Sequence, residues 1–523
     1  MMRYLLHHGV EESAARHPER DAVRLSGEGM TYAELSQRSS QLAHFLIERG
    51  VNRRDRVGVF MDKRLETVIS IYGIMKAGCV YVPLDPRSPA SRLVSIIRDC
   101  DLKGIITQEN KAAVITDVAS QQEILQFVVG TSADGVDTYT WDDVSTFPAS
   151  GVPSRGTTDA DLAYIMYTSG STGAPKGIMH THYSGLSYVK MSAALYDVTH
   201  NDRLSNHSPL HFDMSTFDYL TGPNCGATTV IIPEAFTLFP VNLAQLIEDE
   251  RLTIWYSVPF ALIQLLLRAN IAERDLTSLR WILYGGEPFA INHLRDLMRH
   301  LPDARISNVY GPAEVNQCTY HNLNSVDDMP DGMESVPIGV AVPNDETLVL
   351  DENDAPVAPG EVGELLVQTP TMMQGYWNRP EMNARVFYRR EIYPDYVKTY
   401  LRTGDLVYEN ADGLLEFMGR KDHQVKVRGY RVELAEVDRV LGSHDAVEEA
   451  ASYITRINES DEIAAAVRLR DGAAATANDI IALLRENVPH YAVPRQVYFV
   501  TEFPRTGTGK IDRKRLDDAV KAL

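Results

Sequence analysis

The sequence is poor in cysteine and in long apolar runs. Its 523 residues include four cysteines and no Cys-x-x-Cys pair, which argues against a disulfide scaffold and against a structural zinc site. No uncharged apolar stretch of about 18 residues occurs, and the first residues lack the apolar segment of a signal peptide. We therefore expect a cytoplasmic protein without a membrane span.

Basic residues are also in deficit. The chain has 51 Lys+Arg against 71 Asp+Glu, a formal net charge of -20. Binding to nucleic acids or to anionic membranes depends on an excess of Lys and Arg, so we expect neither kind of partner. The length allows several domains, and 44% hydrophobic residues are enough to fill their cores.

Strand and helix patterns alternate along the first part of the chain. Short apolar runs at Arg56–Phe60 and Val80–Pro83 are typical of buried strands, and the residues between them, Leu65–Ala77, have the pattern of a helix. A second round of alternation runs from Thr228 to Leu301. Strands that alternate with helices predict parallel βαβ units.

The pattern changes in the last third of the sequence. From about Val336 to Phe417, short apolar runs are broken by Gly, Pro, Asn and Asp, which is typical of an all-β region. Mixed helix and strand patterns follow. We predict an α/β multidomain fold. Residues 1–421 would form a large N-terminal lobe with two βαβ-type sheet subdomains and a small β-barrel-like subdomain. Residues 422–523 would form a small, mobile α+β lobe.

The strongest local motif is the Gly/Ser/Thr-rich segment Tyr167–Gly177, which follows a predicted strand. Glycines let backbone N–H groups curl around an anion, and hydroxyls and a lysine add donors and charge. A plain polar loop has the same composition, so the alternative stays open. The segment is not a Walker loop, because Pro175 precedes Lys176 and Gly177 follows it.

The segment Tyr167–Gly177 is one of six motifs that occur in a recognisable order and are spread over nearly the whole chain; the others are Lys76–Pro86, Asn308–Glu314, Tyr400–Asp405, Gly419–Glu433 and Pro504–Lys510. In these motifs and their order, the sequence resembles the superfamily of adenylate-forming enzymes: acyl-CoA synthetases, luciferases and nonribosomal peptide synthetase adenylation domains. The resemblance implies an ATP-dependent, AMP-forming ligase. Such an enzyme converts a carboxylate and ATP to an acyl-adenylate and pyrophosphate, then transfers the acyl group to a thiol.

The resemblance also implies roles for individual residues. The ATP-binding set would be Thr168, Ser169, Gly170, Ser171, Thr172, Gly173, Lys176, Tyr310, Asp405 and Arg420. Glu314 would bind Mg²⁺, a hard cation that prefers carboxylate oxygens, although Ala313 stands before it where the family usually has Thr. Thr168, Glu314 and Lys510 would be catalytic, with Lys510 bridging the substrate carboxylate and the α-phosphate. Asp422 would be the hinge, and Gly429 would line the thiol tunnel.

Asp213 distinguishes the branches of the superfamily. In the amino-acid-activating branch this Asp pairs with the α-ammonium of the substrate, and a buried ammonium requires a charged, hydrogen-bonded partner. Two alternatives remain: Asp213 caps the following helix, or Asp218 is the partner.

The family's specificity positions predict the remaining wall of the amino-acid pocket. They fall on Met214, Phe217, Ser257, Leu283, Gly285, Val309, Gln317 and Cys318. None of these side chains is charged, so we expect a small or medium neutral L-amino acid such as alanine, proline or serine. Gln317 would either contact a polar group of the substrate or brace the wall.

The residues after the last motif bear on the identity of the acyl acceptor. The chain stops thirteen residues after Lys510 without a carrier-protein motif, so we expect a free-standing ligase. Its acceptor would be the phosphopantetheine thiol of a separate acyl or peptidyl carrier protein in nonribosomal peptide or hybrid polyketide biosynthesis. Free coenzyme A is the competing acceptor. Two rival hypotheses are a carboxylate–CoA ligase acting on non-amino acids and a catalytically silent ATP-binding protein of the same fold.

Overall fold

The computed structural model describes residues 3–168, 175–421, 424–457, 460–505 and 511–521. The chain divides into two compact units. The first unit comprises Met1–Pro86, Cys100–Tyr167 and Gly177–Lys421. The second comprises Arg87–Asp99, Thr168–Lys176 and Asp422–Leu523.

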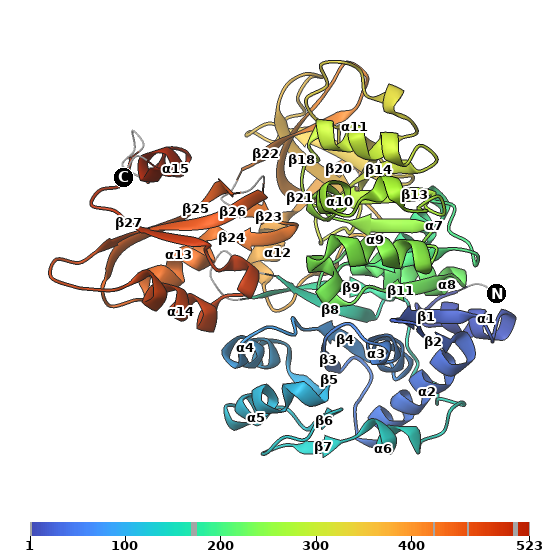
Figure 1. The fold of residues 1–523 in the computed structure, drawn as a ribbon. Helices are drawn as coiled ribbons and strands as arrows, with labels where there is room; N and C mark the ends of the chain where they lie inside the picture. The colour runs from blue at the N-terminus through green and yellow to red at the C-terminus, as the bar shows by residue number, and fades with distance from the viewer. Residues whose placement is uncertain (1–2, 169–174, 422–423, 458–459, 506–510, 522–523) are drawn as a thin grey trace. The chain divides into compact units, whose positions relative to one another are not determined.

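The first unit contains a nine-stranded sheet (Figure 1). Its strands, in spatial order, are β16 (Val340–Ala341), β15 (Thr319–Leu323), β14 (Arg305–Tyr310), β13 (Trp281–Gly285), β12 (Ile254–Ser257), β10 (Arg203–Asn206), β11 (Thr228–Ile231), β1 (Asp21–Leu25) and β2 (Glu28–Thr31). The strands from β14 to β1 are parallel, whereas β15, β16 and β2 are antiparallel additions at the edges. The second round of predicted βαβ units is therefore confirmed.

A second, eight-stranded sheet contains the first round of βαβ units. Its order is β19 (Gly375–Tyr376), β9 (Lys176–Thr181), β8 (Leu162–Thr168), β4 (Val80–Pro83), β3 (Arg56–Phe60), β5 (Leu102–Thr107), β6 (Phe127–Val129) and β7 (Asp137–Tyr139). β19 pairs antiparallel with β9, so a segment from late in the sequence forms the edge of this early sheet.

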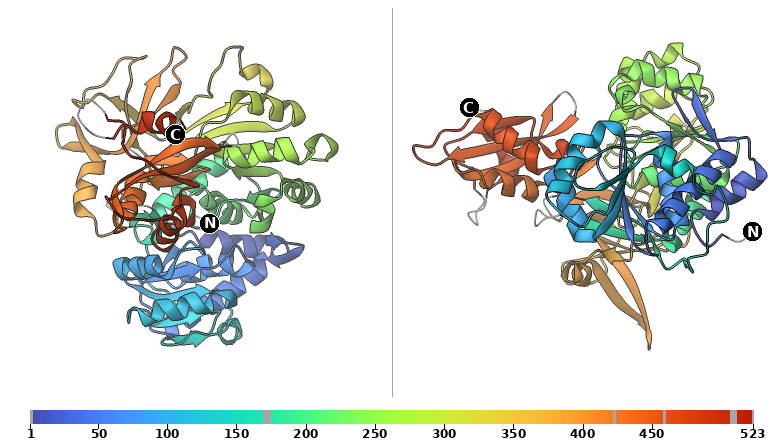
Figure 2. Two further views of the ribbon diagram at one scale, coloured as in Figure 1. Left: turned by 60° about the vertical axis from the view of Figure 1, so that its left-hand side comes forward. Right: turned by 90° about the horizontal axis from the view of Figure 1, so that it is seen from below.

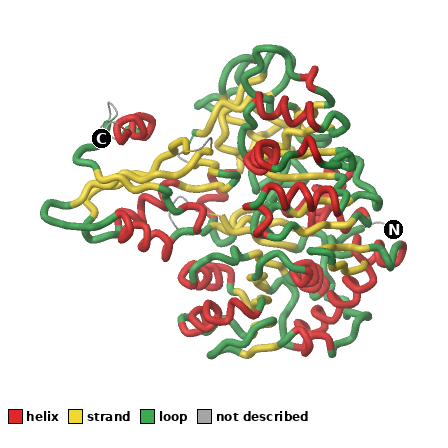
Figure 3. The backbone as a smooth tube through the Cα atoms, in the orientation of Figure 1, coloured by secondary structure: helices red, strands yellow, loops and turns green. Residues whose placement is uncertain are grey.

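Helices cover the two sheets, and Figure 3 shows how helix and strand alternate along them. The helices of the first unit are α1 (His8–Arg16), α2 (Tyr32–Glu48), α3 (Leu65–Lys76), α5 (Ala112–Ser120), α6 (Trp141–Ser145), α7 (His182–Leu195), α8 (Gly222–Cys225), α9 (Pro240–Asp249), α10 (Pro259–Arg268), α11 (Ile291–His300) and α12 (Pro380–Val386). Local sequence sets several starts: Thr31 and Thr181 each form a capping box that satisfies N–H groups in the first turn of α2 and α7. Leucine and isoleucine side chains of α9, α10 and α11 pack on one face of the nine-stranded sheet.

The predicted barrel-like subdomain is an antiparallel sheet of five strands. They are β17 (Glu346–Leu350), β18 (Gly363–Gln368), β21 (Tyr396–Glu409), β20 (Phe387–Tyr393) and β22 (Leu415–Arg420), and β22 pairs with β21. In the right-hand view of Figure 2, β20 and β21 continue as a hairpin beyond the rest of this sheet. The long strand β21 is decisive for the site because it carries Asp405.

The second unit mixes helix and strand, as predicted for the α+β lobe. Its strands are β23 (Gln424–Val427), β24 (Tyr430–Glu433), β25 (Val447–Ile457), β26 (Ser460–Leu469) and β27 (Gln496–Phe499), and its helices include α13 (Leu434–Gly442), α14 (Ala477–Asn487) and α15 (Arg513–Lys521). Most of α4 (Ala90–Cys100) also belongs to this unit, where Arg92 forms a buried ion pair with Glu436 of α13, 3.0 Å apart.

Among the described residues, no helix combines the length and the apolar character that a membrane crossing needs.

Candidate functional site

Asp405, inside β21, is the centre of a buried hydrogen-bonded group that also includes the end of β14. It lies opposite Arg420 in the β21–β22 ladder, and the Arg420 Nη1 contacts Asp405 Oδ1 at 2.5 Å. The hydroxyl of Tyr310, the last residue of β14, donates to Asp405 Oδ2. Burial and the neighbouring carboxylate raise the pKa of Tyr310 well above its usual value, so the phenol keeps its proton. The structure thus brings three of the predicted nucleotide residues into direct contact.

Glu314 lies just beyond β14 and is 2% exposed. Its Oε1 accepts a hydrogen bond of 2.6 Å from the hydroxyl of Tyr376, and its carbonyl accepts one of 2.7 Å from the backbone N–H of Met373. A carboxylate in such a place requires hydrogen bonds or a cation to offset its desolvation. The pair links the edge strand β19 of the eight-stranded sheet to the end of β14 in the nine-stranded sheet.

His180 is a site residue that the sequence analysis missed. Its ring is fully buried in β9, and Nε2 lies 2.9 Å from the carbonyl oxygen of Ala313, which precedes Glu314. The ring also stacks on Tyr164, which in turn stacks on Tyr81. Burial lowers the pKa of His180 to about 4, so the imidazole is neutral near pH 7 and donates one N–H to Ala313.

Five of the predicted pocket residues come together on one face of the nine-stranded sheet. Phe217, Leu283 and Val309 are buried in one apolar cluster, against which Met214 packs. Gly285 lies beside Val309 in the ladder, and a Cβ atom there would meet Val309 O at 2.4 Å and Met214 Cε at 3.6 Å. The wall is therefore apolar, with Met214 lying over the glycine.

For Ser257 the structure differs from the prediction. Ser257 pairs with Tyr284 and Leu283 pairs with Tyr256, so Ser257 lies on the opposite face of the sheet from Leu283. Its Oγ accepts from the indole N–H of Trp255 at 2.8 Å. Because side chains alternate along a strand, the position on the pocket face belongs to Tyr256.

The last two predicted wall residues also have other neighbours. The amide of Gln317 donates to the hydroxyl of Tyr196 at 3.0 Å, an arrangement that braces the aromatic part of the cluster. Cys318 is fully buried in the cluster that contains Tyr310 and Ile178. Gln317 thus holds Tyr196 of the pocket cluster, and Cys318 packs in the same cluster as Tyr310.

The sequence motifs did not point to two buried tyrosines whose pKa values are affected by the charge of Asp213. Tyr188 and Tyr256 belong to the pocket cluster, and Tyr256 packs edge-to-face on Phe217 with ring centroids 5.8 Å apart. Burial first, and the charge of Asp213 in addition, raise the pKa of both phenols well above the usual value. The alternation of strand β12 is the sequence signal that could have identified Tyr256.

Asp218 has a different environment from Asp213. It is 1% exposed, and its Oδ2 accepts from the side-chain amide of Asn206 at 3.1 Å, whose Oδ1 accepts in turn from Tyr219 at 2.8 Å. Burial raises the pKa of Asp218 well above its usual value. Asp218 is therefore part of an internal network, whereas Asp213 is only half-buried.

The remaining predicted residues belong to the second unit or lie outside the described residues. Thr168 ends β8, and its buried Oγ1 has no hydrogen-bond partner in the part of the chain that the structure describes. Lys176 begins β9 and is buried. Gly429, with φ +80°, follows Arg428, with φ +50°, in the two-residue turn between β23 and β24. The residues outside the description are Ser169, Gly170, Ser171, Thr172, Gly173, Asp422 and Lys510.

The comparison with protein families decides the classification. The model described as "AMP-binding enzyme" matches residues 10–377, and the one described as "AMP-binding enzyme C-terminal domain" matches residues 436–510. The chain belongs to the AMP-binding enzyme family. The resemblance to adenylate-forming enzymes is thereby confirmed.

Relatives of this AMP-binding enzyme match it over nearly the full length. An L-proline--[L-prolyl-carrier protein] ligase of Pseudomonas fluorescens is 32% identical, covering 97% of this chain and 98% of that protein. A ligase of the same name from Streptomyces coelicolor is 34% identical, covering 97% and 94%. The solved structure of the amide bond synthetase McbA from Marinactinospora thermotolerans has a TM-score of 0.86 at 25% identity, covering 98% of this chain and 99% of that one.

Proposed function

We propose that this AMP-binding enzyme activates a small or medium neutral L-amino acid, with L-proline as the first candidate. ATP and the amino acid would give aminoacyl-AMP and pyrophosphate, and the aminoacyl group would pass to the phosphopantetheine thiol of a separate carrier protein. The full-length similarity to two ligases whose names specify prolyl-carrier protein supports this reaction.

The observation that carries the proposal is the position of Asp213. Asp213 is half-buried and directly precedes Met214, which packs on the apolar cluster of Phe217 and Leu283. Its charge adds to burial in raising the pKa of Tyr188 and Tyr256. An ammonium group would neutralise this charge, whereas a simple acid brings no group of opposite charge to it. Asp218 is a weaker candidate because its carboxyl group is fully buried and bonded to Asn206.

The pocket wall favours a compact side chain. Met214 lies over Gly285, and Phe217 and Tyr256 contact each other edge-to-face, so bulky groups fill this face of the sheet. The prolyl ring fits such a surface because it is small, apolar and carries its charge on the ring nitrogen.

The residues around Asp405 fit a nucleotide. A carboxylate oxygen accepts more than one hydrogen bond, so Asp405 keeps capacity for ribose hydroxyls while Arg420 and Tyr310 orient it. The buried, unpartnered hydroxyl of Thr168 fits a phosphate oxygen as its acceptor. Glu314 fits Mg²⁺, because a buried carboxylate that one phenol already orients is a suitable ligand for a hard cation. When bound, Mg²⁺ would neutralise phosphate charge.

Catalysis would then consist mainly of positioning and charge neutralisation. The amino acid's carboxylate must lie in line with the bond between the α-phosphorus and the leaving pyrophosphate. Lys510 would contribute the charge that bridges the two reacting groups, together with Lys176 and the phosphate-binding segment Ser169–Gly173. Rotation about Asp422 would afterwards remove Lys510 and bring Gly429 to the thiol path.

The experiment that tests the proposal is ATP–pyrophosphate exchange over a panel of amino acids and simple acids. We expect exchange with small neutral amino acids, led by L-proline, and a loss of at least about a hundredfold in kcat/KM for Asp213→Asn, since one buried charged hydrogen bond is lost. Asp197→Asn, at a surface turn, is the matched control.

The other outcomes separate the rival functions. Exchange only with acids that lack an amine, followed by coenzyme A-dependent turnover, identifies a carboxylate–CoA ligase. No exchange with any acid identifies a silent ATP-binding protein. Loading of a purified carrier protein, followed by mass spectrometry of its phosphopantetheine arm, tests the acceptor directly.

A further inference from the structure

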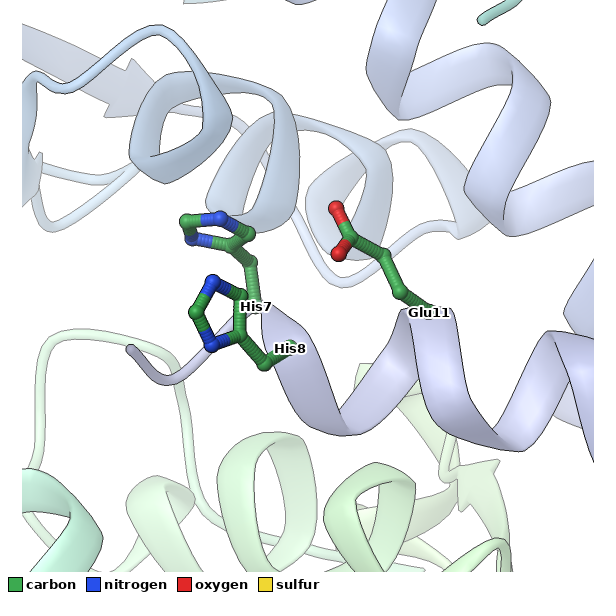
Figure 4. Close-up of side chains that lie close together, drawn as sticks. All are labelled: His7, His8 and Glu11. Atoms are coloured by element: carbon green, nitrogen blue, oxygen red, sulfur yellow. The ribbon is translucent and has the colours of Figure 1, made fainter. Parts of the chain in front are cut away.

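A group of metal-ligand side chains lies far along the chain from the residues discussed above, at the start of α1. His7, His8 and Glu11 place one donor atom each within 4.8 Å of the others. Figure 4 shows their side chains projecting from the same side of the first turn of the helix. This follows from helix geometry, because residues three and four positions apart share a face.

His7 provides an independent sign of a missing ligand. The residue is 8% exposed, and its Nδ1 is buried without a hydrogen-bond partner in the part of the chain that the structure describes. An unpartnered buried nitrogen is costly, and such groups require an explanation. A metal ion bound to this nitrogen would remove the cost.

The surroundings hold the first turn of α1 in place. The backbone N–H of Leu6 donates to Nδ1 of His182, the first residue of α7, at 3.2 Å. The rings of His7 and His8 lie edge-to-face, with centroids 4.7 Å apart. His7 is therefore fixed, whereas His8 is half-buried and Glu11 is exposed, so the latter two can adjust.

The adjustment needed is small. Around a tetrahedral zinc ion with bonds of about 2.1 Å, ligand atoms lie about 3.4 Å apart, so the present spacing must close by at most about 1.4 Å. Lys76 competes for Glu11, since its Nζ lies 4.0 Å from Glu11 Oε1. The same ammonium also bonds to the Ser36 carbonyl at 2.9 Å and to Ser40 Oγ at 3.1 Å. It keeps these partners when Glu11 turns away.

We propose that His7, His8 and Glu11 bind a first-row transition-metal dication such as Zn²⁺. Two imidazoles and one carboxylate are a ligand set that suits zinc, with a fourth position open to water. The ion would hold the side chains at the start of α1 together, next to the existing contact between Leu6 and His182. Its binding would be independent of the adenylation reaction.

The test is titration of the metal-free full-length chain with Zn²⁺ by isothermal calorimetry. We expect one Zn²⁺ per chain, an increase in the unfolding temperature, and at least a tenfold loss of affinity in Glu11→Gln and in His8→Gln. Co²⁺ provides a second probe, because its visible absorption reports tetrahedral coordination. Absence of saturable binding to the wild type would overturn the proposal.

Matched variants exclude binding elsewhere. Glu19→Gln and His300→Gln change exposed residues of the same types and should keep wild-type affinity. A Zn²⁺ affinity that is unchanged in Glu11→Gln and His8→Gln would also overturn the proposal, because Glu11 would then only form an ion pair with Lys76. Amino-acid-dependent exchange without added Zn²⁺ should be equal in Glu11→Gln and the wild type, which shows that the fold is intact.

Discussion

The hydroxyl of Tyr376 donates a hydrogen bond of 2.6 Å to Oε1 of Glu314, and both residues are buried. The two residues come from different sheets, since Tyr376 lies in the edge strand β19 and Glu314 follows β14. The orientation of the carboxylate proposed to bind Mg²⁺ thus depends on how these two strands are placed.

This contact predicts a Mg²⁺-specific defect in Tyr376→Phe. The change leaves a buried carboxylate oxygen short of one hydrogen bond, which costs about 1–3 kcal/mol. We expect the Mg²⁺ concentration for half-maximal pyrophosphate exchange to rise about tenfold, with a smaller change in the KM for the amino acid. Tyr393→Phe at the exposed tip of β20 is the control. An unchanged Mg²⁺ dependence would show that Glu314 does not need the phenol.

Asp405→Asn should affect ATP rather than the amino acid. The amide is neutral, so Arg420 loses its charged partner and Tyr310 loses a strong acceptor. We expect the KM for ATP to rise about 10- to 100-fold, equivalent to about 1.4–2.7 kcal/mol. Steady-state exchange kinetics measure both KM values. Asp412→Asn, in an exposed turn, should behave as the wild type, and an equal rise in both KM values would contradict the assignment.

The pocket wall predicts opposite effects for two substitutions. Met214→Ala removes the side chain that lies over Gly285 and should shift the preference toward larger neutral amino acids, by about tenfold in relative kcat/KM. Gly285→Ala places a Cβ 2.4 Å from Val309 O, so the strands must shift and activity with every amino acid should fall. An unchanged amino-acid ranking in Met214→Ala would place the substrate elsewhere.

His180 predicts a pH-dependent stability. Burial lowers its pKa to about 4, whereas a histidine in the unfolded chain titrates near the usual 6.5. Between these values the unfolded chain binds a proton that the folded chain does not, so stability falls as the pH decreases from 6.5 to 4. The full effect is about 3 kcal/mol. Urea unfolding of His180→Gln should show a shallower loss over this window, and an identical pH dependence would contradict the lowered pKa.

Lys510→Ala should separate the two half-reactions. The lysine is proposed to act only in adenylation, so its loss should abolish pyrophosphate exchange while a supplied aminoacyl-adenylate is still transferred to the carrier protein. Radiolabelled transfer assays measure the second step. Equal loss of both steps would count against a mechanism in which the small lobe turns between them.

Local patterns predicted much of the fold. The short apolar runs at Arg56–Phe60 and Val80–Pro83 form β3 and β4, and the helix predicted between them is α3, because these patterns depend only on neighbouring residues. The Gly- and Asn-interrupted region became an antiparallel sheet rather than more βαβ units. The prediction for Ser257 failed because side chains alternate along a strand: Ser257 lies on the opposite face of the sheet from Leu283, and its neighbour Tyr256 lies on the same face as Leu283.

The sequence by itself determined the family and the order of the motifs, because each motif lies within a few consecutive residues. Only the tertiary structure decided that Tyr376 reaches Glu314, that His180 supports Ala313 and that Arg420 and Tyr310 hold Asp405. These contacts join segments that are distant in the chain. They depend on strand order and register, which no local pattern of residues specifies.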